Sequence, residues 1–280
     1  MKTIVVTGGT GGIGLHTAIG VARSGARVVV TGRDATRGEE AVLRIRQESG
    51  SQHVELALGD LSDASGVEAL AATLNERLDR IDVLVNNAGF LAQERTENAD
   101  GVEIDFAVNV LAPWRLTHGV LPLLRAAAPS RVLLITGGNP SGKFDGSDLQ
   151  ARDGFVALTT YDRSKRAAEA MALVLAERVA DKGVHVNVVY PGGAATAMTR
   201  AMTMKSLPWY MKPAWPLFQF FMSRATPEKA SRSSVYAATT PDLEGVHGAY
   251  IDTNSKRAEL HRTVHDPANQ ARVLAEMGVD

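Results

Sequence analysis

The chain has 280 residues, of which 45% are hydrophobic, and its formal net charge is −1. A chain of this length can bury the core of one large α/β domain, so we expect a single domain over residues 1–280. The near-neutral charge provides no long-range attraction to nucleic acid or to an anionic membrane. The absence of cysteine excludes disulfides, thiolate nucleophiles and cysteine-based metal sites.

The N-terminal sequence MKTIVVTGG runs straight into a strand pattern, with no signal peptide before it. No uncharged apolar run reaches the roughly 18–20 residues that cross a bilayer. We therefore expect a cytoplasmic protein without stable membrane insertion. Only His261 and His265 have helical i, i+4 spacing, and no Glu follows the first of them as in zinc hydrolases, so we expect no metal site.

Short β-branched runs alternate with helical patterns along the chain. Strands are predicted at residues 3–7, 26–31, 54–58, 82–86, 131–136 and 184–189, and helices near 12–23, 36–49, 63–78, 99–127 and 158–182. The strand runs are almost continuously apolar, as in parallel strands covered on both faces. The alternation predicts one doubly wound parallel sheet of the Rossmann type. In such sheets ligands bind beyond the carboxyl ends of the strands, so we expect functional residues in the loops that follow them.

The first predicted strand ends in TGGTGGIG at residues 7–14. Gly8, Gly12 and Gly14 allow a tight turn and a close approach of the backbone to a ligand, and the next helix offers free N–H groups to a pyrophosphate. A glycine-rich string alone is a weak motif, but its place between a first strand and a first helix favours a dinucleotide site over an empty turn. Thr10 and Ile13 belong to the same predicted cradle.

The second predicted strand ends in TGRD at residues 31–34. Folds selective for NAD usually place an acidic residue here for the ribose hydroxyls, whereas this chain has Gly32 followed by Arg33. A guanidinium pairs bidentately with a 2′-phosphate, which favours NADP(H) over NAD(H). Two alternatives stay open: Arg33 as a solvated surface residue, and Asp34 as a competing ligand of the ribose.

The stretch YDRSK places Tyr161 and Lys165 on one face of a helix. A phenol has a pKa of about 10, and a neighbouring cation lowers it. Lys165 can act in this way while it binds the nicotinamide ribose, so that Tyr161 exchanges a proton with a substrate oxygen as hydride moves. The Y-x-x-x-K spacing alone is usually an ordinary surface pair, and its place after the fifth strand makes it a candidate catalytic pair.

Taken together, TGGTGGIG, NNAG at 86–89, YDRSK and YPGGAAT at 190–196 resemble the short-chain dehydrogenase/reductase family in order and spacing. TGRDATRGEEAVLRIR and the segment 226–250 are most similar to its retinol-dehydrogenase-like branch, so the resemblance covers nearly the whole chain. It implies an adenine contact at Asp60 and Leu61, and a water of the proton relay held by Asn109 at a kink of the fourth helix. The resemblance further implies ribose and nicotinamide contacts at Asn86, Ala88, Gly89, Pro191, Gly192 and Thr196.

The family has a Ser at the end of the fifth strand that hydrogen-bonds the substrate oxygen, and here Gly137 in TGGNPS occupies that position. Thr136 precedes it, but the alternation of a strand turns that side chain to the opposite face. We expect Asn139, Ser141, a water or the substrate itself to make up that bond, and we include Ser141 among the candidate catalytic residues. Losing one such donor costs about 10²–10³ in rate, which weakens the case for catalysis without removing it.

The sequence therefore predicts an NADPH-dependent carbonyl reductase or alcohol dehydrogenase acting on a small molecule. Two alternatives stay open: an unusual or redox-neutral step on a specialised metabolite, and an NADP(H)-binding sensor or scaffold without turnover. The presence of Tyr161 argues against the last, because binding alone needs Lys165 but no phenol.

The family places its substrate lid at the position of residues 197–225, and the stretch 204–223 within it is apolar and interrupted by prolines. Its methionines and aromatic residues predict a bulky apolar or polycyclic substrate. A helix packed on the core, an oligomer interface and shallow membrane contact are the alternatives. The family often pairs through its fifth helix, and the apolar stripe at 167–179 therefore favours a homodimer.

Overall fold

The computed structural model describes residues 1–279, and each predicted strand lies within one residue of its expected bounds. The strands are β1 (Thr3–Val6), β2 (Arg27–Gly32), β3 (Val54–Leu58), β4 (Val83–Asn86), β5 (Ser130–Ile135) and β6 (Val184–Val189). They pair in parallel in the order β3-β2-β1-β4-β5-β6. The strand order reverses between β1 and β4, which confirms the predicted doubly wound α/β fold.

Two short strands extend the sheet beyond β6. β7 (Tyr250–Ile251) pairs in parallel with β6, and β8 (Arg257–Ala258) pairs antiparallel with β7. The sequence analysis missed both, because two residues are too few to show a strand alternation.

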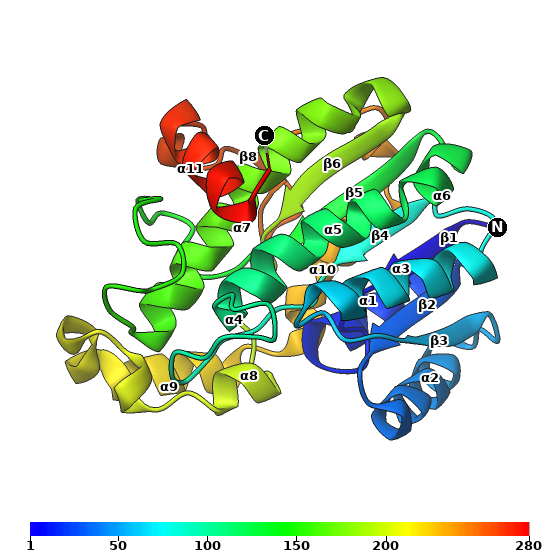
Figure 1. The fold of residues 1–280 in the computed structure, drawn as a ribbon. Helices are drawn as coiled ribbons and strands as arrows, with labels where there is room; N and C mark the ends of the chain where they lie inside the picture. Colours follow the sequence, from blue (N-terminus) through cyan, green and yellow to red (C-terminus); the bar gives the residue numbers. More distant parts are fainter. Residues whose placement is uncertain (280) are drawn as a thin grey trace.

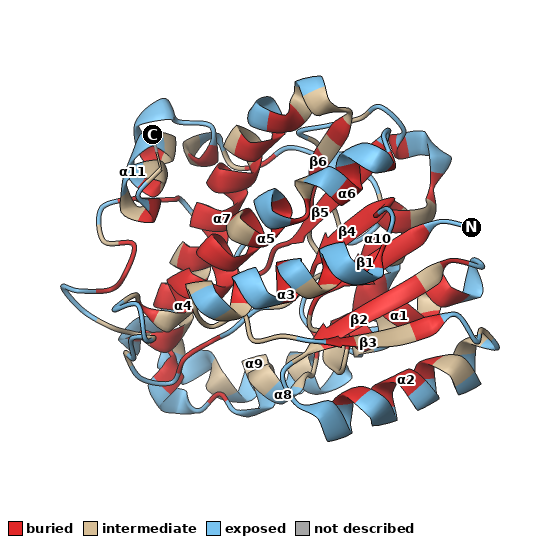
Figure 2. Ribbon diagram, turned by 45° about the vertical axis from the view of Figure 1, so that its right-hand side comes forward, coloured by how far each residue is buried: buried red, intermediate tan, exposed pale blue. Residues whose placement is uncertain are grey.

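Helices cover both faces of the sheet (Figure 1). One face carries α3 (Ala64–Arg77), α5 (Ala112–Gly119) and α7 (Ala157–Val179), with α11 (Pro267–Met277) packed on α7. The other face carries α1 (Gly12–Arg23), α2 (Ala35–Ser49) and α10 (Pro227–Thr239). A separate hydrophobic cluster fills each interface, and Figure 2 shows the strands buried between them. This double cover explains why the strand sequences are nearly continuous apolar runs.

The apolar stripe that was expected to pair two chains is used within this chain. Ala168 and Ala172 on α7 are buried in the same cluster as Val273 and Met277 of α11. The stripe therefore gives no support to pairing through this helix.

The predicted helix at 99–127 is divided into shorter pieces. These are α4 (Ile104–Phe106), a π-helical turn at Ala107–Leu111, α5, and α6 (Leu121–Ala126). The fully buried Glu103 caps α4, because its carboxylate accepts hydrogen bonds from the N–H groups of Asp105 (3.0 Å) and Phe106 (2.9 Å). The π-helical turn carries Asn109, where a kink was expected, and such turns are frequent at functional sites.

The segment 197–225, called the lid segment below, crosses the carboxyl ends of the strands (Figure 1, yellow). It contains α8 (Ala197–Arg200), two 3₁₀ turns at Met204–Ser206 and Trp209–Ala214, and α9 (Trp215–Arg224). Trp215 and Phe218 stack with ring centroids 5.7 Å apart and pack toward a small cluster that includes Tyr161. Among residues 1–279, no helix has the combined length and apolar character that a membrane crossing demands.

Candidate active site

A cavity of about 940 Å³ lies at the carboxyl ends of the parallel strands, beneath the lid segment. The loops after β1 to β6 supply most of its wall, and α4, the π-helical turn, α7 and the lid segment supply much of the remainder. The cavity brings together most of the predicted site residues. They are Gly8, Thr10, Gly12, Ile13, Gly14, Arg33, Asp60, Leu61, Ala88, Gly89, Tyr161, Lys165, Pro191, Gly192 and Thr196.

Three predicted residues do not belong to the cavity wall. Asn86 is buried at the end of β4 and its amide donates to Thr117 Oγ1 (3.4 Å), while the following residue, Asn87, lines the cavity in its place. Ser141 is exposed in the loop after β5. Asn109 lies behind the wall, fully enclosed by the protein. The NNAG motif pointed to Asn87 as strongly as to Asn86, but only the end of the strand decides which amide faces the cavity.

The glycine-rich loop is shaped for a close ligand. Gly8 and Gly12 have φ values of +62° and +53°, in the left-handed region that favours glycine. A Cβ at Gly14 would collide with the carbonyl oxygen of Gly8 and with the side chain of Asn87. No side chain caps the start of α1 at Gly11, so the first-turn N–H groups remain available to an anion. These features fit the pyrophosphate of a dinucleotide.

The loop after β2 explains the missing acidic residue. A Cβ at Gly32 would lie 2.6 Å from Thr10 Cγ2, so an aspartate does not fit there unless the Thr10 side chain moves. The Asp34 carboxylate accepts a hydrogen bond from the N–H of Arg37 (3.0 Å) and so caps α2. Arg33 and Arg37 are exposed and both line the cavity. Arg37 was not predicted from the sequence, although its position in the first helical turn after TGRD was a usable signal.

Tyr161 and Lys165 are buried neighbours on α7. Lys165 Nζ donates to the carbonyl oxygen of Ile135 (3.2 Å) and lies 5.8 Å from the centroid of the Tyr161 ring. Asn109 is fixed close by, since its amide donates to Phe90 O (2.9 Å) and to Ser164 Oγ (2.8 Å). A Cβ at Gly89 would lie 3.1 Å from Lys165 Nζ and 3.3 Å from Asn109 Oδ1, so this glycine lets both side chains approach the cavity.

The loop after β5 has two consecutive glycines that receive two consecutive side chains of α7. A Cβ at Gly137 would collide with Tyr161 Oη, and a Cβ at Gly138 would collide with Asp162 Oδ1. Thr136 also lines the cavity, but its hydroxyl donates to Glu169 Oε1 of α7 (2.6 Å). Gly137 itself has no hydroxyl to offer beside Tyr161.

The short chain dehydrogenase family model matches residues 2–206. The chain belongs to this family. Retinol dehydrogenase 14 from Mus musculus is 34% identical over 273 residues, which cover 92% of this chain and 79% of the relative. Polyprenol dehydrogenase from Mus musculus is 34% identical, with 98% and 82% of the two chains covered. A solved active-site complex of Pseudomonas aeruginosa RhlG with NADP has a TM-score of 0.69 at 28% identity, and covers 90% of this chain and 94% of its own.

This short-chain dehydrogenase is thus an oxidoreductase near the retinol dehydrogenase branch, with a fold that takes a nicotinamide cofactor. The family and the fold predicted from the sequence are confirmed.

The pKa of Tyr161 in the short-chain dehydrogenase site differs from the expectation. Burial lowers the pKa of Lys165 to about 8, while the charges of Glu169 and Asp105 act against this shift. Burial raises the pKa of Tyr161, and the nearby carboxylates Asp162 and Asp105 raise it further. A lowering of this pKa by Lys165 was expected from the sequence, but burial has the largest effect and raises it.

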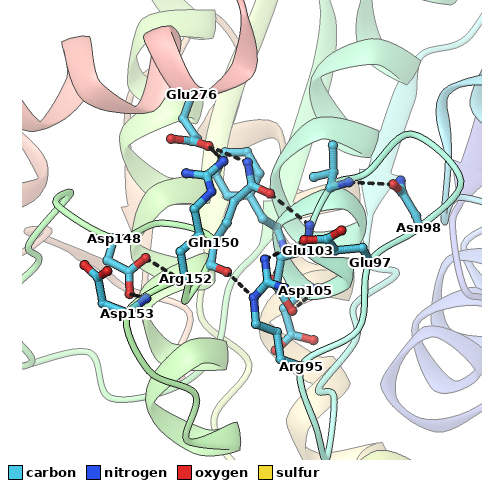
Figure 3. Close-up of polar contacts among 12 residues, drawn as sticks. Arg95, Glu97, Asn98, Glu103, Asp105, Asp148, Gln150, Arg152, Asp153 and Glu276 are labelled. Atoms are coloured by element: carbon cyan, nitrogen blue, oxygen red, sulfur yellow. Dashed lines mark hydrogen bonds and ion pairs between the residues drawn. The ribbon is translucent and has the colours of Figure 1, made fainter.

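A polar network behind the short-chain dehydrogenase site joins its loops to the C-terminal helix (Figure 3). Gln150 Oε1 accepts from the N–H of Glu103 (2.9 Å), and Gln150 Nε2 donates to Glu276 of α11. The carbonyl oxygen of Gln150 accepts from Arg95 Nε (3.2 Å). Because Glu103 caps the helix that leads to Asn109, the network holds the 139–156 loop and the Asn109 turn in one arrangement.

Proposed function

We propose that this protein is an NADPH-dependent carbonyl reductase that acts, in the reverse direction, as an alcohol dehydrogenase on a bulky apolar substrate. The observation that carries the proposal is the presence of Tyr161 and Lys165 in the same cavity as the glycine-rich loop. No observation favours a redox-neutral step or a binding-only protein.

The loop after β2 favours NADP(H). Arg33 and Arg37 are two cations beside the place where a 2′-phosphate would lie, and a Cβ at Gly11 would be 3.8 Å from Arg37 Nη2. Asp34, which competed for the ribose in the sequence analysis, caps α2 instead. The NADP in the RhlG complex is consistent with this choice.

The chemistry follows from the position of each side chain. A nicotinamide cofactor would supply or accept the hydride. Lys165 would hold the ribose of that half of the cofactor, and its charge would favour the ionised phenol. Tyr161 gives a proton to the carbonyl oxygen during reduction and takes one from the alcohol during oxidation. Asn109 holds the Phe90 backbone beside this pair.

The lid segment, residues 197–225, indicates the substrate class, and we assign it as a lid within a single domain. Its contribution to the cavity wall is mainly apolar: Met198, Met202, Met211, Phe218 and Met222. Flexible methionines and aromatic rings suit a large apolar substrate. The names of the related retinol and polyprenol dehydrogenases point to the same class.

The test replaces Tyr161 with Phe and follows NADPH oxidation with all-trans-retinal and a panel of aryl ketones. We expect turnover to fall by at least about 10²-fold because the proton donor is gone, while NADPH binding, followed by its fluorescence, stays intact. Tyr236→Phe is the matched control, since Tyr236 bonds Asp242 on the surface of α10 (3.1 Å) and should retain full activity. Undiminished activity of Tyr161→Phe would refute the proposal.

A further inference from the structure

We propose that the lid segment binds the surface of a membrane that contains anionic phospholipid. In this arrangement the outward side of α9 and the 3₁₀ turn before it lie among the lipid headgroups. The binding step goes beyond the proposed carbonyl reductase function and does not depend on turnover.

The lid segment exposes large apolar side chains to solvent. Of the large apolar side chains in residues 1–279 that are at least half exposed, all but Met1 and Leu43 lie in this segment. We call this set the outer lid surface: Met204, Trp209, Tyr210, Leu217, Phe220 and Phe221. Exposed apolar patches of this kind mark contacts with a membrane, a protein or a ligand.

The helix α9 is apolar on two sides. Phe218 and Met222 are one turn apart and line the cavity. Leu217, Phe220 and Phe221 have i, i+3, i+4 spacing, so they share another side of the helix, and all three are exposed. A helix at a protein surface normally turns polar residues to its outer side. Packing within residues 1–279 therefore does not explain the apolar outer side of α9.

The turn before α9 extends the same surface. It spans Trp209–Ala214 and packs on α9. Trp209 and Tyr210 are both exposed, and their rings form an edge-to-face pair with centroids 6.0 Å apart. Trp and Tyr combine an apolar ring with a polar N–H or O–H group, which suits them to the boundary between lipid chains and water.

The charge of the lid segment is entirely positive. It contains Arg200, Lys205, Lys212 and Arg224 and no Asp or Glu, in a chain whose net charge is −1. All four cations are exposed, and none forms an ion pair with a carboxylate of residues 1–279. The Arg224 guanidinium lies 3.6 Å from the centroid of the Phe220 ring, so this cation borders the outer lid surface. Basic and apolar side chains together are typical of segments that bind anionic membranes.

The charges favour a membrane over a second copy of the chain. In a two-fold symmetric dimer the same patch faces itself, so the four cations of one lid segment would face the four of the other. The segment has no carboxylate to offset this repulsion. An anionic lipid surface attracts all four cations while its headgroup region accepts the aromatic rings.

A membrane would also supply the substrate class that we propose. The inner side of α9 lines the cavity and the outer side would face the lipid. An apolar substrate dissolved in the bilayer would then reach the cavity beneath the lid without crossing water. This part of the inference rests on the proposed function.

The first experiment measures binding of the full chain to vesicles by co-sedimentation, without cofactor or substrate. One set of vesicles is phosphatidylcholine alone, and the other, the mixed vesicles, is equal parts of phosphatidylcholine and phosphatidylserine. We expect at least about tenfold tighter binding to the mixed vesicles, because each Lys or Arg near an anionic surface strengthens binding by about fivefold. High salt should reduce the difference.

Paired substitutions separate the apolar from the basic contribution. Phe220→Ala with Phe221→Ala should weaken binding to the mixed vesicles by at least about tenfold, since two rings no longer leave water. Lys205→Gln with Lys212→Gln should weaken it by about thirtyfold and change binding to phosphatidylcholine by less than about threefold. The matched control is Lys2→Gln with Leu43→Ala, which removes an exposed cation and an exposed apolar side chain outside the lid segment and should bind as the wild type does.

Tryptophan fluorescence locates the contact. Trp209 is 80% exposed, whereas Trp114 is buried on α5. We expect the mixed vesicles to shift the emission of the wild-type protein to shorter wavelength and to shift that of Trp209→Phe far less.

Three results would overturn the inference. They are no binding to either kind of vesicle, equal binding to both kinds, and wild-type binding by the protein with Phe220→Ala and Phe221→Ala. A dimer that forms with rising concentration in sedimentation velocity, is lost in this double variant and does not bind vesicles would assign the outer lid surface to a second copy instead.

Activity separates this inference from the proposed function. With an aryl ketone in water and no vesicles, the double variant at Phe220 and Phe221 should turn over as fast as the wild type, because neither residue lines the cavity. With retinal supplied in the mixed vesicles, the variant should be slower, and equal rates would refute the supply of substrate from the membrane. Absence of turnover by the wild-type protein with every substrate would overturn the proposed function and leave the vesicle binding in place.

Discussion

At the scale of single residues, the site depends on the absence of side chains at Gly137 and Gly138. Tyr161 Oη and Asp162 Oδ1 occupy the space in which Cβ atoms would stand. A side chain at Gly137 would displace Tyr161, and a side chain at Gly138 would displace Asp162.

Gly138→Ala tests this account of the loop. The new Cβ meets Asp162 and the residue has a φ of +74°, so we expect a loss of about 1–3 kcal/mol in the free energy of unfolding and at least about tenfold in turnover. Urea denaturation and NADPH oxidation measure the two effects. Gly154→Ala is the matched control, since nothing lies within 4 Å of its Cβ. Equal behaviour of the two variants would contradict the account.

The cofactor preference is also decided by single residues. We expect Arg33→Ala and Arg37→Ala each to raise the Kd for NADPH by about 10–100-fold, because a charge-assisted bond to the 2′-phosphate is lost. The Kd for NADH should change by less than about threefold, since NADH has no such phosphate. Fluorescence titration gives both values, and Arg44→Ala, which removes the pairing with Glu48 on α2, is the control. Equal losses for both cofactors would show that neither arginine binds the phosphate.

The sequence identified the residues whose role depends on local spacing. Tyr161 and Lys165 share a helix face, and the glycine-rich loop follows a strand, so both were predictable from a few neighbouring letters. Asp162, Arg37 and the fit of Thr10 against Gly32 depend on contacts between distant segments, and no local pattern shows such contacts.

At the scale of elements, the short helix α4 contains a buried aspartic acid. Asp105 is fully buried, and its Oδ1 accepts from the N–H of Ala92 (2.8 Å). Burial and the charge of Glu103 raise the pKa of Asp105 to about 8. An aspartate in the unfolded chain has a pKa of about 3.9. Between these values the folded state holds the extra proton, so the free energy of unfolding falls as the pH rises.

Asp105→Asn should remove part of this pH dependence, because an amide oxygen still accepts from Ala92 but does not ionise. From pH 5 to pH 8, the free energy of unfolding should fall by about 2–4 kcal/mol less in the variant than in the wild-type protein. Urea denaturation at three pH values measures the difference, with the exposed Asp79→Asn as the control. Parallel curves for wild type and Asp105→Asn would show that Asp105 does not carry the dependence.

The elements themselves were predictable where the hydrophobic pattern was long. The six parallel strands and the helices α1, α2, α3 and α7 lie close to their expected bounds. The bounds of the π-helical turn at Ala107–Leu111 were not predictable from the local sequence, because its Asn109 is bonded to Phe90 and Ser164 in other parts of the fold. The short β7 and β8 depend on pairing with β6, which a local pattern does not show.

At the scale of the whole molecule, two helical layers bury the faces of the sheet, and the cavity lies at the carboxyl ends of its strands. Figure 1 shows the lid segment over that edge, and Figure 2 shows that the lid is far less buried than the strands beneath it. Leu217, Phe220 and Phe221 are among its exposed apolar side chains, while Phe218 and Met222 face the cavity. A bulky apolar substrate would be enclosed by the inner face of this segment.

The central claim is that hydride passes between the nicotinamide and a carbonyl carbon in this cavity. The most direct measurement incubates the protein with all-trans-retinal and NADPH deuterated at the transferred position, and determines the mass of the alcohol formed. We expect one deuterium on the carbinol carbon, and at least about 10²-fold less labelled alcohol in the same time with Tyr161→Phe. Binding of NADPH without any deuterated alcohol, from retinal or from the ketone panel, would contradict the claim.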